Sequence, residues 1–477
     1  MASMRDFIKS VATVLPEIPK PEKKPSLNER LIWTAIALVM YLVMAVTPLY
    51  GLGGTNASAS NELSFLRVVF ASAQGSLMTL GIGPIVTAGL ILQLLVGSDI
   101  IKLDMGDSND RAIFGSATKL LTLIVITGEA GAYIVGGALG VLTGTQSIVI
   151  FVQLFVASLI VLLLDEMIQK GWGIGSGVSL FIMAGVAQTV MWYTFSPFTL
   201  RVSATSTATV IFGFIPALIQ AAFNNSLSTI LVRTSNYPSL LTFVLTIVMI
   251  LILVYIEGIR VELPITSTKY RGFQGVYPIK LLYVSNIPVI LVSALSANVT
   301  FFTQLLQRYS ASNSWVHLLG TWPVNATTGT YPTGGLVYYI TAPQGLTQTL
   351  TDPVHAVIYL VFLVVMAVIF ARLWVEIGGL NPKAVAKNLM DADVQVPGFR
   401  RTGLSIEAVL NRYIPTLTII GGILIGLIAG ISDLFGVFGS GIGILLMVDI
   451  VLQYYQMLLK EQVEELSPGL AGLIGAT

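Results

Sequence analysis

The stretch "TLGIGPIVTAG", Thr79 to Gly89, opens an apolar run that continues to about Val96. A helix that crosses a membrane satisfies its backbone hydrogen bonds internally, yet this one begins with two glycines and a proline around a single isoleucine. Irregular backbone at membrane depth is tolerated only where protein buries it or water reaches it. Whether the glycines keep space open or allow close helix packing, the stretch predicts a spanning helix that starts inside a bundle.

The composition indicates an all-α membrane protein. Hydrophobic residues make up 55% of the 477 and charged residues only 10%, whereas soluble chains carry about 25% charge. The apolar residues form runs of roughly 20, the length that crosses a ~30 Å hydrocarbon core. We expect ten spans, at about 31–50, 77–97, 117–140, 146–168, 174–195, 240–260, 281–303, 353–375, 410–431 and 438–458.

The distribution of lysine and arginine predicts the orientation of these spans. With the N-terminus in the cytoplasm, all but four of the 25 basic residues lie in cytoplasmic segments, as in most membrane proteins. Both ends of the chain are then cytoplasmic, and we expect the protein to lie in the cell membrane. No cleavable signal peptide is expected, because the first apolar run starts only near Leu31. The absence of cysteine and the presence of only two histidines argue against a metal site.

An internal repeat indicates two related halves. The segment "GSGVSLFI", Gly175–Ile182, matches "GSGIGILL", Gly439–Leu446, and a weaker match pairs "GPIV" at the start of span 2 with "IPVI" at the start of span 7. The offset of five spans is odd, so the halves have opposite topology, as in inverted repeats. The expected units are an amphipathic arm and linker (1–30), an N-terminal half (31–200), an external link (201–239), a C-terminal half (240–460) and a tail (461–477).

Five segments in the same order resemble the SecY family of protein-conducting channels, in its archaeal and eukaryotic branch. They are "TLGIGPIVTAG…QLLVGS", "GWGIGSGVSLFI", "YPIKLLYVSNIPVILVSAL", "NPKAVAKNL" and "VPGFRR". The resemblance implies two inverted five-helix halves around an hourglass pore, which opens sideways to lipid between spans 2–3 and 7–8. It also implies the central subunit of a translocation channel, which passes unfolded secretory polypeptides and releases transmembrane segments into lipid.

The resemblance also assigns roles to residues. The family's aliphatic pore ring, a constriction that can gate by dewetting, falls on Ile82, Val86, Val178, Ile182, Ile290 and Leu446. The plug is a short helix at about 62–74, with Leu66, Arg67, Val68, Phe70 and Ala71. The polar cluster of the lateral gate falls on Thr87, Glu129 and Asn298. Ribosome docking falls on Arg260, Lys269, Arg271, Arg400 and Arg401.

Simpler interpretations of these residues stay open. A lone aliphatic pair at i,i+4 is usually ordinary core, and Glu129 can be a buried carboxylate with a local hydroxyl partner. The basic loops need no more than the positive-inside rule.

A secondary transporter is the alternative function, since transporters also use inverted repeats and broken helices. It would need ion-coupling groups near the midplane, where the ionisable residues reduce to Glu129 and, further along, Asp449. No motif points to an enzyme or a cofactor. The partners that the resemblance implies are SecE/gamma and beta subunits, the ribosome and its RNA, nascent chains with signal sequences, and membrane lipid.

Overall fold

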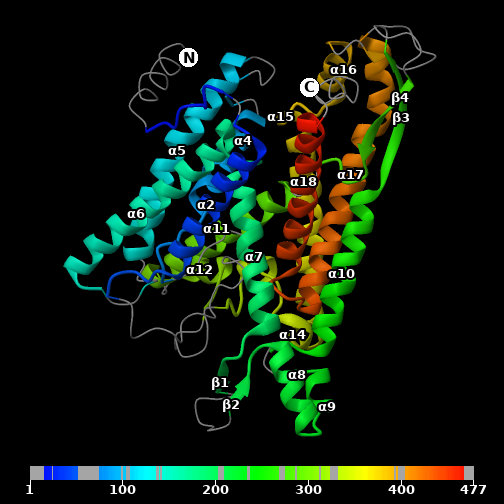
Figure 1. The fold of residues 1–477 in the computed structure, drawn as a ribbon. Helices are drawn as coiled ribbons and strands as arrows, with labels where there is room; N and C mark the ends of the chain where they lie inside the picture. The colour runs from blue at the N-terminus through cyan, green and yellow to red at the C-terminus, as the bar shows by residue number, and fades with distance from the viewer. Residues whose placement is uncertain are drawn as a thin grey trace.

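The computed structural model describes residues 16–23, 25–51, 75–97, 100–101, 103, 108–135, 139, 142–201, 209–233, 237–267, 274–284, 287–310, 313–322, 331–391, 394–395 and 403–466. Within these ranges the chain is a bundle of long helices with small β-structures at its two ends (Figure 1). The start of α2, the end of α18 and the β3–β4 hairpin lie toward one end, whereas β1, β2, α8 and α9 lie at the other.

The elements follow the chain in this order. Up to residue 201 they are α2 (Leu27–Val46), α4 (Gly83–Gly97), α5 (Ser108–Val135), α6 (Gly144–Met167), the π-helical turn η1 (Ile168–Trp172), α7 (Gly177–Phe195) and β1 (Thr199–Arg201). The link continues with β2 (Thr209–Ile211), α8 (Phe214–Phe223) and α9 (Ser228–Leu231). The remaining elements are α10 (Leu240–Gly258), β3 (Arg260–Ser267), β4 (Gln274–Lys280), α11 (Ile287–Ser310), α12 (Ser314–Leu319), α13 (Leu336–Ile340), α14 (Gly345–Thr351), α15 (Pro353–Ile377), α16 (Pro382–Asp391), β5 (Val394–Gln395), α17 (Gly403–Phe435) and α18 (Gly441–Leu466).

Nine helices of the described chain are long and apolar enough to cross a membrane: α2, α5, α6, α7, α10, α11, α15, α17 and α18. The remaining expected span, the second at about 77–97, corresponds to α4, which has only 15 residues. The expected start of that span at residue 77 is wrong: residues 75–82 form turns, with Gly81 at φ +56°, and the helix begins at Gly83. The broken start that the opening stretch predicted is therefore present, but the helical part is shorter than expected.

Several helices extend beyond the apolar runs. α5 begins at Ser108 instead of about 117, α17 begins at Gly403 instead of about 410, and α18 continues to Leu466. Their added turns contain polar and charged residues. Hydropathy marks only the part of a helix that fits the hydrocarbon layer, so polar extensions of the same helix escape it.

Two small antiparallel sheets were not predicted. β3 pairs with β4 from Arg260 to Thr266, and β5 adds to its other edge near the hairpin tip, which gives the order β4-β3-β5. The inner faces of the hairpin, with Leu263 and Ile279, pack in one apolar cluster with Ile406 and Leu410 of α17. An isolated hairpin is marginally stable, so this packing stabilises it. The loops after α10 and after α16 thus form one structure.

Glycines allow the most extensive helix contact, that of α15 with α17. A Cβ at Gly422 would lie 3.0 Å from the Val368 Cα, and one at Gly426 would lie 2.8 Å from the Val364 Cα. Small residues let backbones approach in membranes, where packing rather than the hydrophobic effect holds helices together. α15 and α17 therefore form a tightly packed pair.

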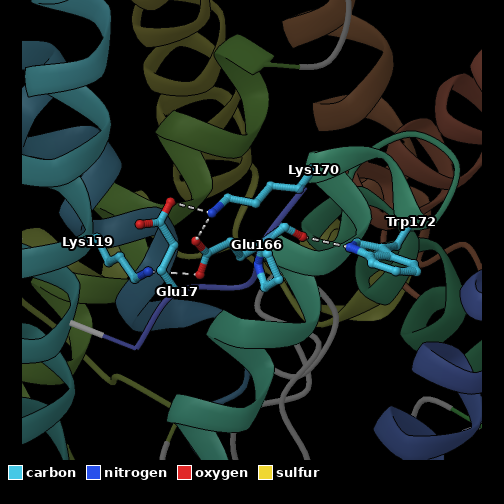
Figure 2. A network of polar contacts seen from close by, with 6 residues as sticks. Glu17, Lys119, Glu166, Lys170 and Trp172 are labelled. Atoms are coloured by element: carbon cyan, nitrogen blue, oxygen red, sulfur yellow. Dashed lines mark hydrogen bonds and ion pairs between the residues drawn. The ribbon is translucent and has the colours of Figure 1, made fainter. Parts of the chain in front are cut away.

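A polar network ties the segment before α2 to α5 and α6 (Figure 2). Lys119 of α5 bonds Glu166 of α6 at 2.8 Å, and Lys170 bonds the other Glu166 oxygen at 2.9 Å. Lys170 also pairs with Glu17 of the N-terminal segment. Glu166 thus bridges two spanning helices and, through Lys170, the N-terminal segment.

The same region joins the two ends of the described chain. The indole N–H of Trp172 donates to the Pro19 carbonyl at 2.8 Å, as Figure 2 shows. Arg30 donates to the Gly173 carbonyl at 3.1 Å and pairs with Glu461 near the end of α18. The starts of α2 and α7 and the end of α18 therefore lie on the same side of the bundle.

Candidate functional site

The two repeated glycine-rich starts lie at opposite ends of a helix pair, α7 and α18. At one end the Tyr454 hydroxyl of α18 donates to the Ser176 carbonyl at 3.0 Å, and a Cβ at Gly175 would lie 2.9 Å from the Tyr454 Cζ. At the other end a Cβ at Gly439 would lie 3.5 Å from the Val190 Cγ2 of α7. The two helices are therefore antiparallel, which is the relationship that an inverted repeat requires.

This arrangement places two of the predicted ring residues at the same depth. Gly439, two residues before α18, and Tyr454 on α18 mark the two ends of the pair and are 15 residues apart, or about 22 Å at the helical rise. Ile182 is seven residues after Gly175, and Leu446 is seven residues after Gly439. Each side chain thus lies about 10 Å from opposite ends of the pair, near its middle, and both are completely buried.

All six predicted ring residues belong to one apolar cluster: Ile82, Val86, Val178, Ile182, Ile290 and Leu446. They lie at or near the starts of four helices, α4, α7, α11 and α18. Three are completely buried and three are partly buried. Aliphatic groups offer no ligand to ions, and a narrow apolar constriction gates by dewetting. The structure places the six in the same extended apolar cluster, and their role as a pore ring stays a prediction.

The three predicted gate residues also meet. The Asn298 amide of α11 donates to the Thr87 hydroxyl of α4 at 3.0 Å and to the Ala294 carbonyl of its own helix at 2.9 Å. Thr87 also shares a side-chain hydrogen bond with Glu129 of α5. The Thr87 hydroxyl therefore lies at the centre of a chain that joins three helices, and it is a local partner for the Glu129 carboxyl.

Apolar contacts continue the same seam between α4–α5 and α11–α15. The Tyr133 ring of α5 stacks on the Phe301 ring of α11, with centroids 4.8 Å apart. A Cβ at Gly97 of α4 would lie 2.8 Å from the Ile377 Cδ1 of α15. One ring pair and close packing at Gly97 therefore accompany the hydrogen bonds across the described seam.

Two buried carboxylates at the starts of α7 and α18 were missed by the sequence analysis. Asp165 of α6 accepts the Val178 N–H at 3.0 Å and the Gly177 N–H. Asp433 of α17 accepts the Gly441 N–H at 2.6 Å. In each half, an aspartate on the preceding helix therefore caps the helix that contributes to the apolar cluster.

A signal for this pair exists in the sequence. An aspartate precedes each "GSG" segment, but Asp165 is ten residues before Gly175 and Asp433 is six residues before Gly439. The unequal spacing, which includes the η1 turn in the first half, hides the correspondence in a gap-free comparison.

The predicted docking residues are only partly described. Arg260 is the first residue of β3, with a side chain that is 59% exposed and an Nε 3.2 Å from the Glu262 carboxylate. Lys269, Arg271, Arg400 and Arg401 lie outside the described residues, and so do the predicted plug residues Leu66, Arg67, Val68, Phe70 and Ala71.

Comparisons with known proteins identify the family of the whole chain. The family model described as SecY matches residues 76–455, and that described as the plug domain of Sec61p matches residues 39–75. The protein transport protein Sec61 subunit alpha of Dictyostelium discoideum is 40% identical over 476 residues, which cover 98% of both chains.

Solved structures share the fold over nearly the full length. One, described as the structure of a protein conducting channel, superposes with a TM-score of 0.80 at 35% identity and covers 97% of this chain and 98% of its own. Another, Sec61 in the canine ribosome-channel complex from the endoplasmic reticulum, gives a TM-score of 0.78 at 34% identity with the same coverage.

Proposed function

Because this chain belongs to the SecY family, we propose that it is the central subunit of a protein translocation channel. It passes unfolded secretory polypeptides across the membrane and releases transmembrane segments sideways into lipid. The observation that carries this function is the position of Ile182 and Leu446, which are both completely buried in one apolar cluster near the middle of two antiparallel repeats. A secondary transporter is not supported, since the relatives are protein-transport channels.

The apolar cluster acts as the neck of the pore in this proposal. Its side chains bind neither ions nor a particular sequence, so they exclude ions by dewetting and slide along any translocating chain. The segment at about 62–74 acts as a plug that seals the neck from outside. The seam of Thr87, Glu129 and Asn298 holds the lateral gate closed and opens when a sufficiently apolar segment replaces its contacts.

The remaining partners follow from the family and from the charged loops. We propose that the ribosome docks through Arg260, Lys269, Arg271, Arg400 and Arg401, as a relative binds one in the canine complex. SecE/gamma and beta subunits complete the channel. The chain itself catalyses no reaction, so the energy for transport comes from a partner.

The chain is a multi-pass membrane protein, and we place both of its ends in the cytoplasm. The positive-inside rule supports this orientation, and so does the common position of α2's start, α18's end and the sheet at one end of the bundle (Figure 1). The sequence analysis expects the cell membrane, and a relative comes from the endoplasmic reticulum. Both membranes have a cytoplasmic face, so the orientation is the same in either.

Ion conductance of the resting channel tests the proposed neck. Ile182→Gly with Leu446→Gly should raise the conductance of planar bilayers that contain the channel, because a wider, wettable neck loses its dewetting barrier. Deletion of residues 62–74 should add to this leak. Ile150→Gly with Leu154→Gly is the matched control, because these two completely buried residues belong to a different apolar cluster. A resting conductance equal to that of the control would overturn the assignment of the neck.

A further inference from the structure

The starts of α7 and α18 are attached to the preceding helices in the same way. A Cβ at Gly177 would lie 2.6 Å from the Asp165 Cα, and one at Gly441 would lie 2.8 Å from the Asp433 N and collide with the Ser432 side chain. Each helix therefore begins with its backbone directly against the helix before it. At both points an aspartate from that helix accepts main-chain N–H groups of the first turn.

The partners of the two carboxylates explain why they tolerate burial. Asp165 also accepts from the Gln169 amide at 2.8 Å, and Asp433 also accepts from the Tyr359 hydroxyl of α15 at 2.7 Å. A carboxylate in a spanning region is costly unless such bonds surround it. The first N–H groups of a helix supply them, because they lack partners within the helix and carry partial positive charge.

The attachment points stand at the same distance from the neck. Gly177 is five residues before Ile182, and Gly441 is five residues before Leu446. Val178 combines both functions, since its N–H bonds Asp165 while its side chain packs on the apolar cluster. A slip of one residue would move a helix by about 1.5 Å and turn it by about 100°, which would take its aliphatic side chain out of the neck.

We propose that Asp165 and Asp433 are positioning residues that set the depth and rotation of the pore-lining helices α7 and α18, and thereby the seal of the neck. The proposal rests on the proposed function, because it presumes that the apolar cluster is that neck. It adds that the seal depends on two polar attachments outside the apolar cluster, related by the inverted repeat.

Replacement of each aspartate tests the proposal by conductance. Asp165→Ala and Asp433→Ala remove the acceptor and should raise the resting conductance per channel roughly fivefold or more, the shift expected for a lost helix cap. Asp165→Asn and Asp433→Asn keep a carbonyl oxygen for the same N–H groups and should stay near the unmodified channel. The thermal midpoint of each purified variant is measured in parallel.

Asp352→Ala is the matched control. Asp352 caps the spanning helix α15 by accepting the His355 N–H at 3.1 Å, but none of the six ring residues lies on α15. This variant should lower the thermal midpoint without a leak. If it leaks as much as Asp165→Ala, the seal responds to any lost cap and the proposal is overturned.

Two further results separate the possible failures. If Ile182→Gly with Leu446→Gly leaks while Asp165→Ala and Asp433→Ala do not, the neck stands and the positioning role is wrong. If the glycine pair does not leak either, the proposed neck itself fails. Where an alanine variant does not assemble, Asp165→Glu or Asp433→Glu replaces it: the longer carboxylate shifts the helix start, so an unchanged resting conductance overturns the proposal.

Discussion

Asn298 and Thr87 are 211 residues apart in the sequence, yet the Asn298 amide donates a hydrogen bond of 3.0 Å to the Thr87 hydroxyl. The bond joins α11 to α4, and Thr87 passes the connection on to Glu129 of α5. The Asn298–Thr87 bond joins two neutral groups and is easily reversible, because such a bond contributes only about 0.5–1.5 kcal/mol net. This suits the proposed lateral gate, which would open for some segments and close behind them.

Removal of the Thr87 hydroxyl should make the gate open more easily. Thr87→Val keeps the shape of the side chain but loses its bonds to Asn298 and Glu129, so the open-to-closed ratio should rise by up to about tenfold per bond. The measurement is the fraction of a marginally hydrophobic test segment that enters lipid instead of crossing the membrane. Thr300→Val is the control, because within the described part of the chain that hydroxyl bonds the Ser296 carbonyl of its own helix and no other helix. Equal insertion by both variants would contradict a gating role.

Gly426 should be essential for the packing of α15 on α17. A Cβ at this position would lie 2.8 Å from the Val364 Cα, so backbone must move to admit it. We expect Gly426→Ala to lower the free energy of unfolding by about 1–3 kcal/mol, as overpacking does, and to lower the thermal midpoint in detergent. Gly128→Ala on α5, where nothing lies within 4 Å, should leave the midpoint unchanged or raise it. A lower thermal midpoint for Gly128→Ala than for Gly426→Ala would refute this account of the packing of α15 on α17.

The attachment of the N-terminal segment should weaken in acid. The hydrogen bond from Lys170 lowers the pKa of Glu17 below its ordinary value of 4.5. A lowered pKa means that the ionised carboxylate stabilises the attached state above pH 4.5, and that this contribution disappears as pH falls through the lowered value. The effect is small, because the Glu17 side chain is 65% exposed.

A nitroxide at Lys20→Cys, the sole cysteine of such a chain, reports the attachment through its mobility. Mobility should increase as pH falls below the ordinary carboxyl value, and Glu17→Gln should be mobile at every pH. Glu22→Gln, in the same segment, should keep the pH dependence. If the spectrum of the labelled protein that retains Glu17 does not change with pH, the prediction is refuted.

The orientation of the chain can be measured at two exposed positions. Asn388→Cys on α16 should react with an impermeant thiol reagent from the cytoplasmic side, and Ser228→Cys on α9 from the opposite side. Sealed vesicles of known sidedness separate the two reactions. Reaction of both sites from the same side would rule out the proposed topology.

Arg260 should contribute to ribosome binding without affecting the fold. Its side chain is exposed on β3 and, among the residues that the structure describes, pairs with the neighbouring Glu262, so Arg260→Glu removes no core contact. If Arg260 meets RNA phosphate, the variant should weaken binding and lower the slope of log affinity against log salt by about 0.7–0.9. Lys20→Glu in the N-terminal segment is the charge-matched control, and Arg400→Glu repeats the test on the second loop. If the unmodified protein, both arginine variants and the control have the same affinity and slope, these arginines serve only to orient the chain in the membrane.

The sequence predicted the features that depend on composition and on local chemistry. Runs of apolar residues located the spanning helices, and the glycines around Ile82 indicated a broken start inside the bundle. The match between Gly175–Ile182 and Gly439–Leu446 predicted an inverted relationship, which the antiparallel pairing of α7 and α18 confirms.

Features that depend on tertiary contacts escaped prediction. β3 and β4 carry Pro264 and Pro278, and proline argues against a strand unless one edge is unpaired. Pro264 meets this condition, because β5 pairs only with the last residues of β3. Asp165 and Asp433 escaped for another reason: a single acid in an apolar helix does not show which N–H groups it will meet.

The three-stranded sheet β4-β3-β5 gives the channel one connected surface through which a partner can hold the C-terminal half. Main-chain pairing of Thr266 with Gln395 joins the loop after α10 to the loop after α16, and the packing of Leu263 on α17 fixes both to the helices beneath. A force on either loop is therefore transmitted to the helices of the C-terminal half. In the described chain, no segment before residue 200 contributes a strand to this sheet. A partner that binds this sheet would therefore bear on the helices of the C-terminal half, and not directly on the helices before residue 200.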